Sequence, residues 1–70
     1  MQPATLETAQ ARYTAAYEAY QRASRRVAEK LKNGLVPTGE EVAQEAAAAE
    51  ALGAARRTLM DAIANAAPAR

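Results

Sequence analysis

Large side chains recur at every seventh position along the first half of the chain: Leu6, Tyr13, Tyr20 and Val27. An alanine follows three residues after each of the first three: Ala9, Ala16 and Ala23. A seven-residue repeat of large and small residues places both on one face of an α-helix, where they can pack against another helix. The pattern therefore predicts a long helix that is buried on one face against a second helix of this chain or of a partner.

The composition predicts a small core. The chain has 70 residues, and 21 of its 35 hydrophobic residues are alanine. Alanine favours helix formation but buries little apolar area, and a chain of this length buries only about 60% of its unfolded surface. Cysteine is absent, so no disulfide can add stability. Association with another chain is the expected additional source of stability.

Local signals divide the chain into two helices within a single domain, residues 1–70. Pro3 suits the first turn of a helix, and no glycine or proline follows before Gly34. The first helix is therefore expected over about residues 3–32. Gly34 favours the left-handed conformation that ends many helices. Residues 33–38 are expected to form the turn.

The second helix begins with a capping signal. Pro37 disfavours helical geometry at the residue before it, and Thr38 and Glu41 have the spacing of a capping box. This helix is expected over about residues 39–66, ending before Pro68. Two helices of similar length with a short connection predict an all-α antiparallel two-helix hairpin, which would dimerise into a four-helix bundle of coiled-coil type.

Charge placement favours the same hairpin. If the chain turns midway between the two helices, residues 25–26, which are both arginine, lie near Glu45. The same geometry places Lys30 and Lys32 near the two glutamates at residues 40–41. In one continuous helix these opposite charges would be too far apart to pair.

The second helix carries its own seven-residue series: Val42, Ala49, Arg56 and Ile63, with Leu52, Leu59 and Ala66 in the adjoining series. These residues are interpreted as the seam that meets the first helix. Gly53 falls at the level of Tyr17 and Tyr20, where a missing side chain would leave room for a ring. Tyr13 falls near residues 56–57, where an arginine could stack on its phenol ring.

The three tyrosines share one helical face and have two interpretations. They could fill the core against the second helix and a second hairpin, or they could form an aromatic surface for a partner protein, because tyrosine is common at interfaces. The residues expected to bind a partner are Leu6, Tyr13, Tyr17, Tyr20 and Val27.

The residues of most active sites are missing. The chain has no histidine and no cysteine, which are the commonest general base, metal ligand and thiol nucleophile. Its glycines stand alone and form no phosphate-binding loop. We expect a protein that is not an enzyme, with no catalytic residue, no metal, no cofactor and no small-molecule substrate.

One basic cluster needs an interpretation: Arg22, Arg25 and Arg26. The simplest is a solvated face neutralised by the glutamates of the second helix. The alternative is contact with the phosphates of RNA or DNA by a dimeric hairpin. The net charge of +1 gives no attraction of the whole chain to nucleic acid.

The expected function is that of a small protein-interaction module, such as an adaptor, inhibitor or chaperone-like protein. It would bind a second copy of itself and another protein through an apolar helical face. The alternatives are nucleic-acid binding and a structural subunit of a larger assembly, such as a secretion or phage complex. No stretch approaches the ~20 apolar residues of a membrane span, so the cytoplasm is the expected compartment. Abundant alanine and an excess of arginine over lysine are typical of GC-rich bacterial or phage genomes.

Overall fold

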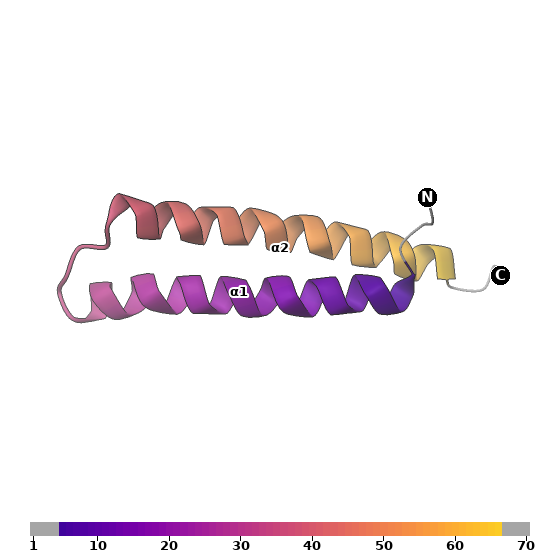
Figure 1. The fold of residues 1–70 in the computed structure, drawn as a ribbon, viewed down its shortest axis with the longest axis horizontal. Helices are drawn as coiled ribbons and strands as arrows, with labels where there is room; N and C mark the ends of the chain where they lie inside the picture. The colour runs from indigo at the N-terminus through magenta and orange to yellow at the C-terminus, as the bar shows by residue number, and fades with distance from the viewer. Residues whose placement is uncertain (1–4, 67–70) are drawn as a thin grey trace.

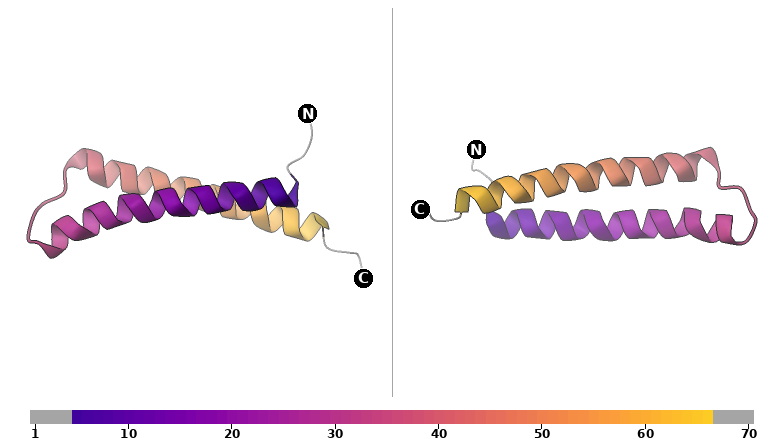
Figure 2. Two further views of the ribbon diagram at one scale, coloured as in Figure 1. Left: turned by 60° about the horizontal axis from the view of Figure 1, so that its bottom comes forward. Right: turned by 180° about the vertical axis from the view of Figure 1, so that it is seen from behind.

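The structure is a computed structural model that describes residues 5–66 and shows two antiparallel helices lying side by side (Figure 1). Helix α1 spans Leu6–Lys32 and helix α2 spans Gly39–Ala66. The predicted all-α hairpin is confirmed. Its two helices cross at a shallow angle along a thin rod of 53 × 25 × 14 Å (Figure 2). The radius of gyration of 15.8 Å is well above the ~11 Å of a compact chain of this length.

The start of α1 differs from the prediction. Thr5 has extended backbone angles (φ −76°, ψ 163°), and its Oγ1 accepts a hydrogen bond of 3.0 Å from the backbone N–H of Thr8. Thr5 therefore caps the helix from outside, which satisfies one of the N–H groups that lack a helical partner. The expected helical conformation at Thr5 is wrong for this reason, and Pro3 lies outside the described residues.

The end of α1 is the predicted glycine-terminated turn. Gly34 has a φ of +77°, in the left-handed region that glycine adopts without steric cost. Its N–H donates to the carbonyl oxygen of Leu31 at 3.1 Å, and the N–H of Leu35 donates to the carbonyl oxygen of Lys30 at 2.7 Å. These two bonds form a Schellman motif, which turns the chain back toward the start of α2.

The predicted capping box opens α2. The N–H of Thr38 donates to Oε1 of Glu41 at 2.9 Å, and the N–H of Glu41 donates to Oγ1 of Thr38 at 3.1 Å. The same Oε1 forms a salt bridge of 2.8 Å with Nζ of Lys30. Glu41 therefore joins the cap of α2 to the last turn of α1, which fixes the relative level of the two helices.

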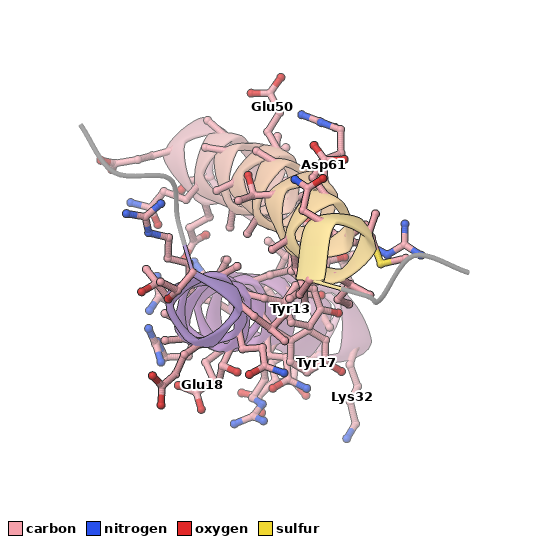
Figure 3. The ribbon with its side chains drawn as sticks, turned by 90° about the vertical axis from the view of Figure 1, so that its right-hand side faces the viewer. Tyr13, Tyr17, Glu18, Lys32, Glu50 and Asp61 are labelled. Carbon is pink, nitrogen blue, oxygen red and sulfur yellow. The ribbon has the colours of Figure 1, made fainter. Side chains whose placement is uncertain are left out.

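The other expected charge pairs do not form. Arg26 donates through Nη1 to Oε1 of Gln44 at 3.3 Å, instead of pairing with Glu45. Lys30–Glu41 is the only salt bridge among residues 5–66. Lys32 points away from α2 (Figure 3), because it lies on the outer side of α1 and not beside the seam.

The two helices meet along seams that run the length of the hairpin. On α1, Ala9 is fully buried and Val27 is 8% exposed. The other residues of this seam are half-buried: Leu6, Tyr13, Ala16, Tyr20, Ala23 and Lys30. On α2 the seam consists of half-buried residues spaced alternately by four and three positions: Glu41, Glu45, Ala48, Leu52, Ala55, Leu59 and Ala62. This spacing keeps all seven on the face that meets α1.

The series expected to lead the seam of α2 lies outside it. All four of its residues are exposed, as is Ala66: Val42, Ala49, Arg56 and Ile63. Each residue turns a helix by about 100°, so packing Leu52 and Leu59 against α1 moves this series onto the side of the hairpin. The prediction was wrong because the series would have buried the charged group of Arg56, whereas the leucines bury only apolar surface.

Candidate interaction surface

The register of the hairpin defines two flanks, one on each side of the seam. The Arg26–Gln44 hydrogen bond shows that residues immediately before seam positions Val27 and Glu45 share one flank. By the same helical geometry, residues immediately after a seam position, such as Val42 after Glu41, share the opposite flank. Each flank therefore combines one edge of α1 with one edge of α2.

Large apolar side chains line the second of these flanks, which we call the apolar flank: Tyr17 and Leu31 from α1, and Val42, Met60 and Ile63 from α2. Each exposes between 43% and 61% of its surface. Small residues lie between them on α2: Ala46, Ala49 and Gly53. The end-on view shows Tyr17 on one side of the hairpin, with Glu50 and Asp61 on the outer side of α2 (Figure 3). The flank therefore offers a row of apolar groups with solvent-facing charges beyond it.

The structure divides the predicted partner-binding residues between the seam and the surface. Val27 is buried, and Leu6, Tyr13 and Tyr20 are half-buried against α2. Tyr17 is 44% exposed, so it alone of the five reaches the apolar flank. Its ring stacks with that of Tyr13 at a centroid distance of 6.1 Å and an interplanar angle of 16°, so the half-buried ring supports the exposed one.

Two expected contacts of the tyrosines are absent. A Cβ added at Gly53 would have one atom within 4 Å, Nη1 of Arg57 at 3.8 Å, so no tyrosine ring fills that position. The ring partner of Tyr13 is Tyr17 and not Arg56 or Arg57. The prediction for Gly53 was wrong because it placed this residue opposite α1, whereas Gly53 stands one position after the seam residue Leu52 and belongs to the apolar flank.

Sequence reasoning did not single out Leu31 and Met60 as surface residues. It also placed Val42 and Ile63 in the seam, although they lie on the flank. A usable signal was present, since Val42 and Ile63 belong to a seven-residue series that lies three positions before the series containing Leu52 and Leu59. A second apolar series beside the first widens the apolar face of the helix, which indicates that the flank is itself apolar.

The opposite flank carries the arginine patch, which consists of Arg22, Arg25 and Arg26. Together with Glu29 these residues line a shallow, open hollow on α1. None of the three arginines forms a salt bridge with another described residue. The expected neutralisation by the glutamates of α2 is therefore incomplete, and the patch leaves three positive groups beside one negative group.

The turn between the two helices lowers the pKa of one carboxyl group, that of Glu41. The hydrogen bond from Lys30, followed by that from the backbone N–H of Thr38, lowers the pKa of Glu41 below its ordinary value of 4.5. Both donors favour the ionised carboxylate. The role of Glu41 is to hold the two helix ends together, since Lys30 and Thr38 occupy the same oxygen atom.

The described residues contain neither a cluster of metal ligands nor a membrane-spanning helix. Within residues 5–66 no group of three or more His, Cys, Asp or Glu side chains is placed to hold a metal ion. Neither α1 nor α2 contains a stretch long and apolar enough to cross a membrane. Comparison of the chain with protein families, with characterised proteins and with solved structures found no match.

Proposed function

We propose that this protein is a non-catalytic helical interaction module of the adaptor, inhibitor or chaperone-like kind. Its apolar flank binds helices, and the hairpin pairs with a second copy to form a four-helix bundle in the cytoplasm. One observation carries the proposal. Five large apolar side chains stand exposed along one flank of a hairpin whose buried residues, within the described chain, are only Ala9 and Val27.

The exposed surface of the hairpin supports this proposal quantitatively. The chain exposes 5520 Å², whereas a compact protein of 7.4 kDa exposes about 4200 Å². The excess of roughly 1300 Å² exceeds the ~800 Å² that each partner contributes to an ordinary protein interface. Covering the apolar flank with a second layer of helices would remove a large part of this excess.

Thermal unfolding at several protein concentrations tests the proposal. Circular dichroism should show a Tm that rises over a hundredfold increase in concentration, because association stabilises only the folded chain. A cooperative transition with a constant Tm would contradict it. A particle size that grows beyond a dimer would favour the structural subunit of a larger assembly instead.

A second candidate function is the binding of RNA or DNA. The observation in its favour is that the arginine patch gathers at one hollow without a salt bridge to any described carboxylate. Binding through phosphates weakens steeply as salt rises. Fluorescence anisotropy with labelled duplex RNA and DNA at low salt should then show binding that the triple variant R22Q/R25Q/R26Q loses. Absence of binding by the wild-type chain at low salt would remove this candidate.

A further inference from the structure

The residues that α2 contributes to the apolar flank complement the same residues taken in reverse order about Gly53. We propose that a second copy of this chain packs on the apolar flank in antiparallel orientation. Helix α2 then lies along α2 of the other copy, and the two turns are at opposite ends of the bundle. This inference rests on the proposed function and names its first partner and the geometry of the complex.

Complementarity of size is the first argument. Gly53 lies midway between Ala46 and Met60, and within one position of the midpoint between Val42 and Ile63. In the reversed arrangement Val42 of one copy meets Ile63 of the other, which joins apolar groups that are 49% and 43% exposed. Met60 meets Ala46, so a long side chain packs against a short one. The two Gly53 residues meet at the centre, where the helix axes come closest.

Separation of like charges is the second argument. Arg56 is the only charged residue of α2 within the apolar flank, and it stands three positions after Gly53. Reversal about Gly53 therefore keeps the two Arg56 residues about six positions apart along the bundle, roughly 9 Å at 1.5 Å per residue. The two guanidinium groups do not face each other across the contact.

Helix α1 adds an aromatic contact at the same level. The Lys30–Glu41 salt bridge fixes the register so that Gly53 lies at the level of residue 18 on α1. Tyr17 is therefore next to the centre of the flank. In the reversed arrangement the two Tyr17 rings, each 44% exposed, meet beside the glycine pair, which buries their faces and leaves their hydroxyls at the rim.

The parallel arrangement, with both turns at one end, fits less well. It would place α1 of one copy on α2 of the other at equal levels. Met60 and Ile63 would then lie at the levels of residues 11 and 8 of α1. The nearest residues of α1 on the apolar flank are Gln10 and Glu7, so that apolar groups would be covered by polar ones. The reversed arrangement avoids this mismatch, because it covers the same two residues with Ala46 and Val42.

Cysteine cross-linking tests the arrangement in a chain that has no cysteine of its own. Gly53→Cys is compatible with the hairpin, because its Cβ would meet only Nη1 of Arg57 at an ordinary distance of 3.8 Å. Mild oxidation should link two such chains, because disulfides need Cα atoms about 4.4–6.8 Å apart. Ala51→Cys, two positions away on the opposite flank, is the matched control and should stay reduced at the same concentration.

Two further variants fix the direction of the helices. Val42→Cys alone and Ile63→Cys alone should not self-link, whereas a mixture of the two should give the heterodisulfide on a non-reducing gel. Light scattering of each reduced variant measures whether it is a monomer or a dimer, and so separates a wrong arrangement from a failure to dimerise. A dimer in which Gly53→Cys links no faster than Ala51→Cys would overturn the antiparallel arrangement and leave the proposed function standing. A monomer at all concentrations would overturn both.

Discussion

The two flanks of this hairpin differ in the chemistry that they present, although the same two helices build both. The apolar flank exposes Tyr17, Met60 and Ile63 with one charged residue of α2, Arg56, among them. The opposite flank exposes the arginine patch. Two helices alone leave both flanks open, so the seam determines the fold, while we propose that the residues beside the seam determine which molecules the hairpin can bind.

The largest expected effect comes from placing the same charge on either flank. Ala49 lies on the apolar flank and Ala51 on the opposite one, and both are exposed. Ala49→Glu should weaken association at least a hundredfold, or about 2.7 kcal/mol, because each copy would bring an unpaired carboxylate into an apolar contact. Ala51→Glu, with the same change in helix propensity, should leave association as it is. Sedimentation equilibrium measures both, and equal weakening would contradict the assignment of the flanks.

The seam should respond differently from the flank. Val27→Ala removes two buried methyl groups at a residue that is 8% exposed, so we expect a loss of about 2 kcal/mol in the free energy of unfolding. This loss should appear at every protein concentration in urea titrations. Val42→Ala is the control, because Val42 is 49% exposed. Its effect on the free energy of unfolding should disappear at low protein concentration, where association is negligible. A concentration-dependent loss for Val27→Ala would place that residue in the intermolecular contact.

The ends of the helices could be predicted because each depends on local chemistry. The Thr38–Glu41 box and the left-handed Gly34 require only neighbouring residues, and the structure shows both. The cap at Thr5 is equally local, but the prediction began the helix at Pro3, because proline suits the first turn of a helix. The sequence signal for this cap is a threonine just before the helix. The hydroxyl oxygen of Thr5 accepts a hydrogen bond from the N–H of Thr8, three residues later.

The contact face of α2 could not be chosen from the sequence by the same means. Two seven-residue series lie three positions apart, one containing Leu52 and Leu59 and the other Val42 and Ile63. In an alanine-rich helix both are weakly apolar, so packing against α1 decides between them. The apolar flank follows from that choice, because the series that does not face α1 is left exposed.

A smaller effect is expected at the turn that holds both flanks in register. Thr38→Ala removes the hydroxyl that accepts the N–H of Glu41, so the free energy of unfolding should fall by about 1 kcal/mol. Thr58→Ala removes an exposed hydroxyl from the middle of α2 and should change stability by no more than about 0.5 kcal/mol. Urea unfolding followed by circular dichroism measures both, and equal losses would mean that the cap adds nothing.

The smallest effect is a pH dependence of stability. Lys30 and the N–H of Thr38 lower the pKa of Glu41 in the folded chain below 4.5. The stability that Glu41 contributes is therefore complete above pH 4.5 and is lost as the pH falls through the lower folded value. Glu41→Gln should flatten the decrease in Tm below pH 4.5. Glu50→Gln is the control, because it removes a carboxylate that points away from both helices (Figure 3), and it should keep the wild-type dependence of Tm on pH. If Glu41→Gln also kept the wild-type dependence, the contribution of Glu41 to acid stability would be contradicted.

The mass of the wild-type chain in solution shows directly whether the apolar flank is covered by the helices of a second copy. Sedimentation equilibrium over a range from micromolar to several hundred micromolar should give a mass that approaches twice 7.4 kDa. A mass that stays at 7.4 kDa over the whole range, for a chain that unfolds cooperatively, would show that the hairpin is complete by itself and would contradict the account.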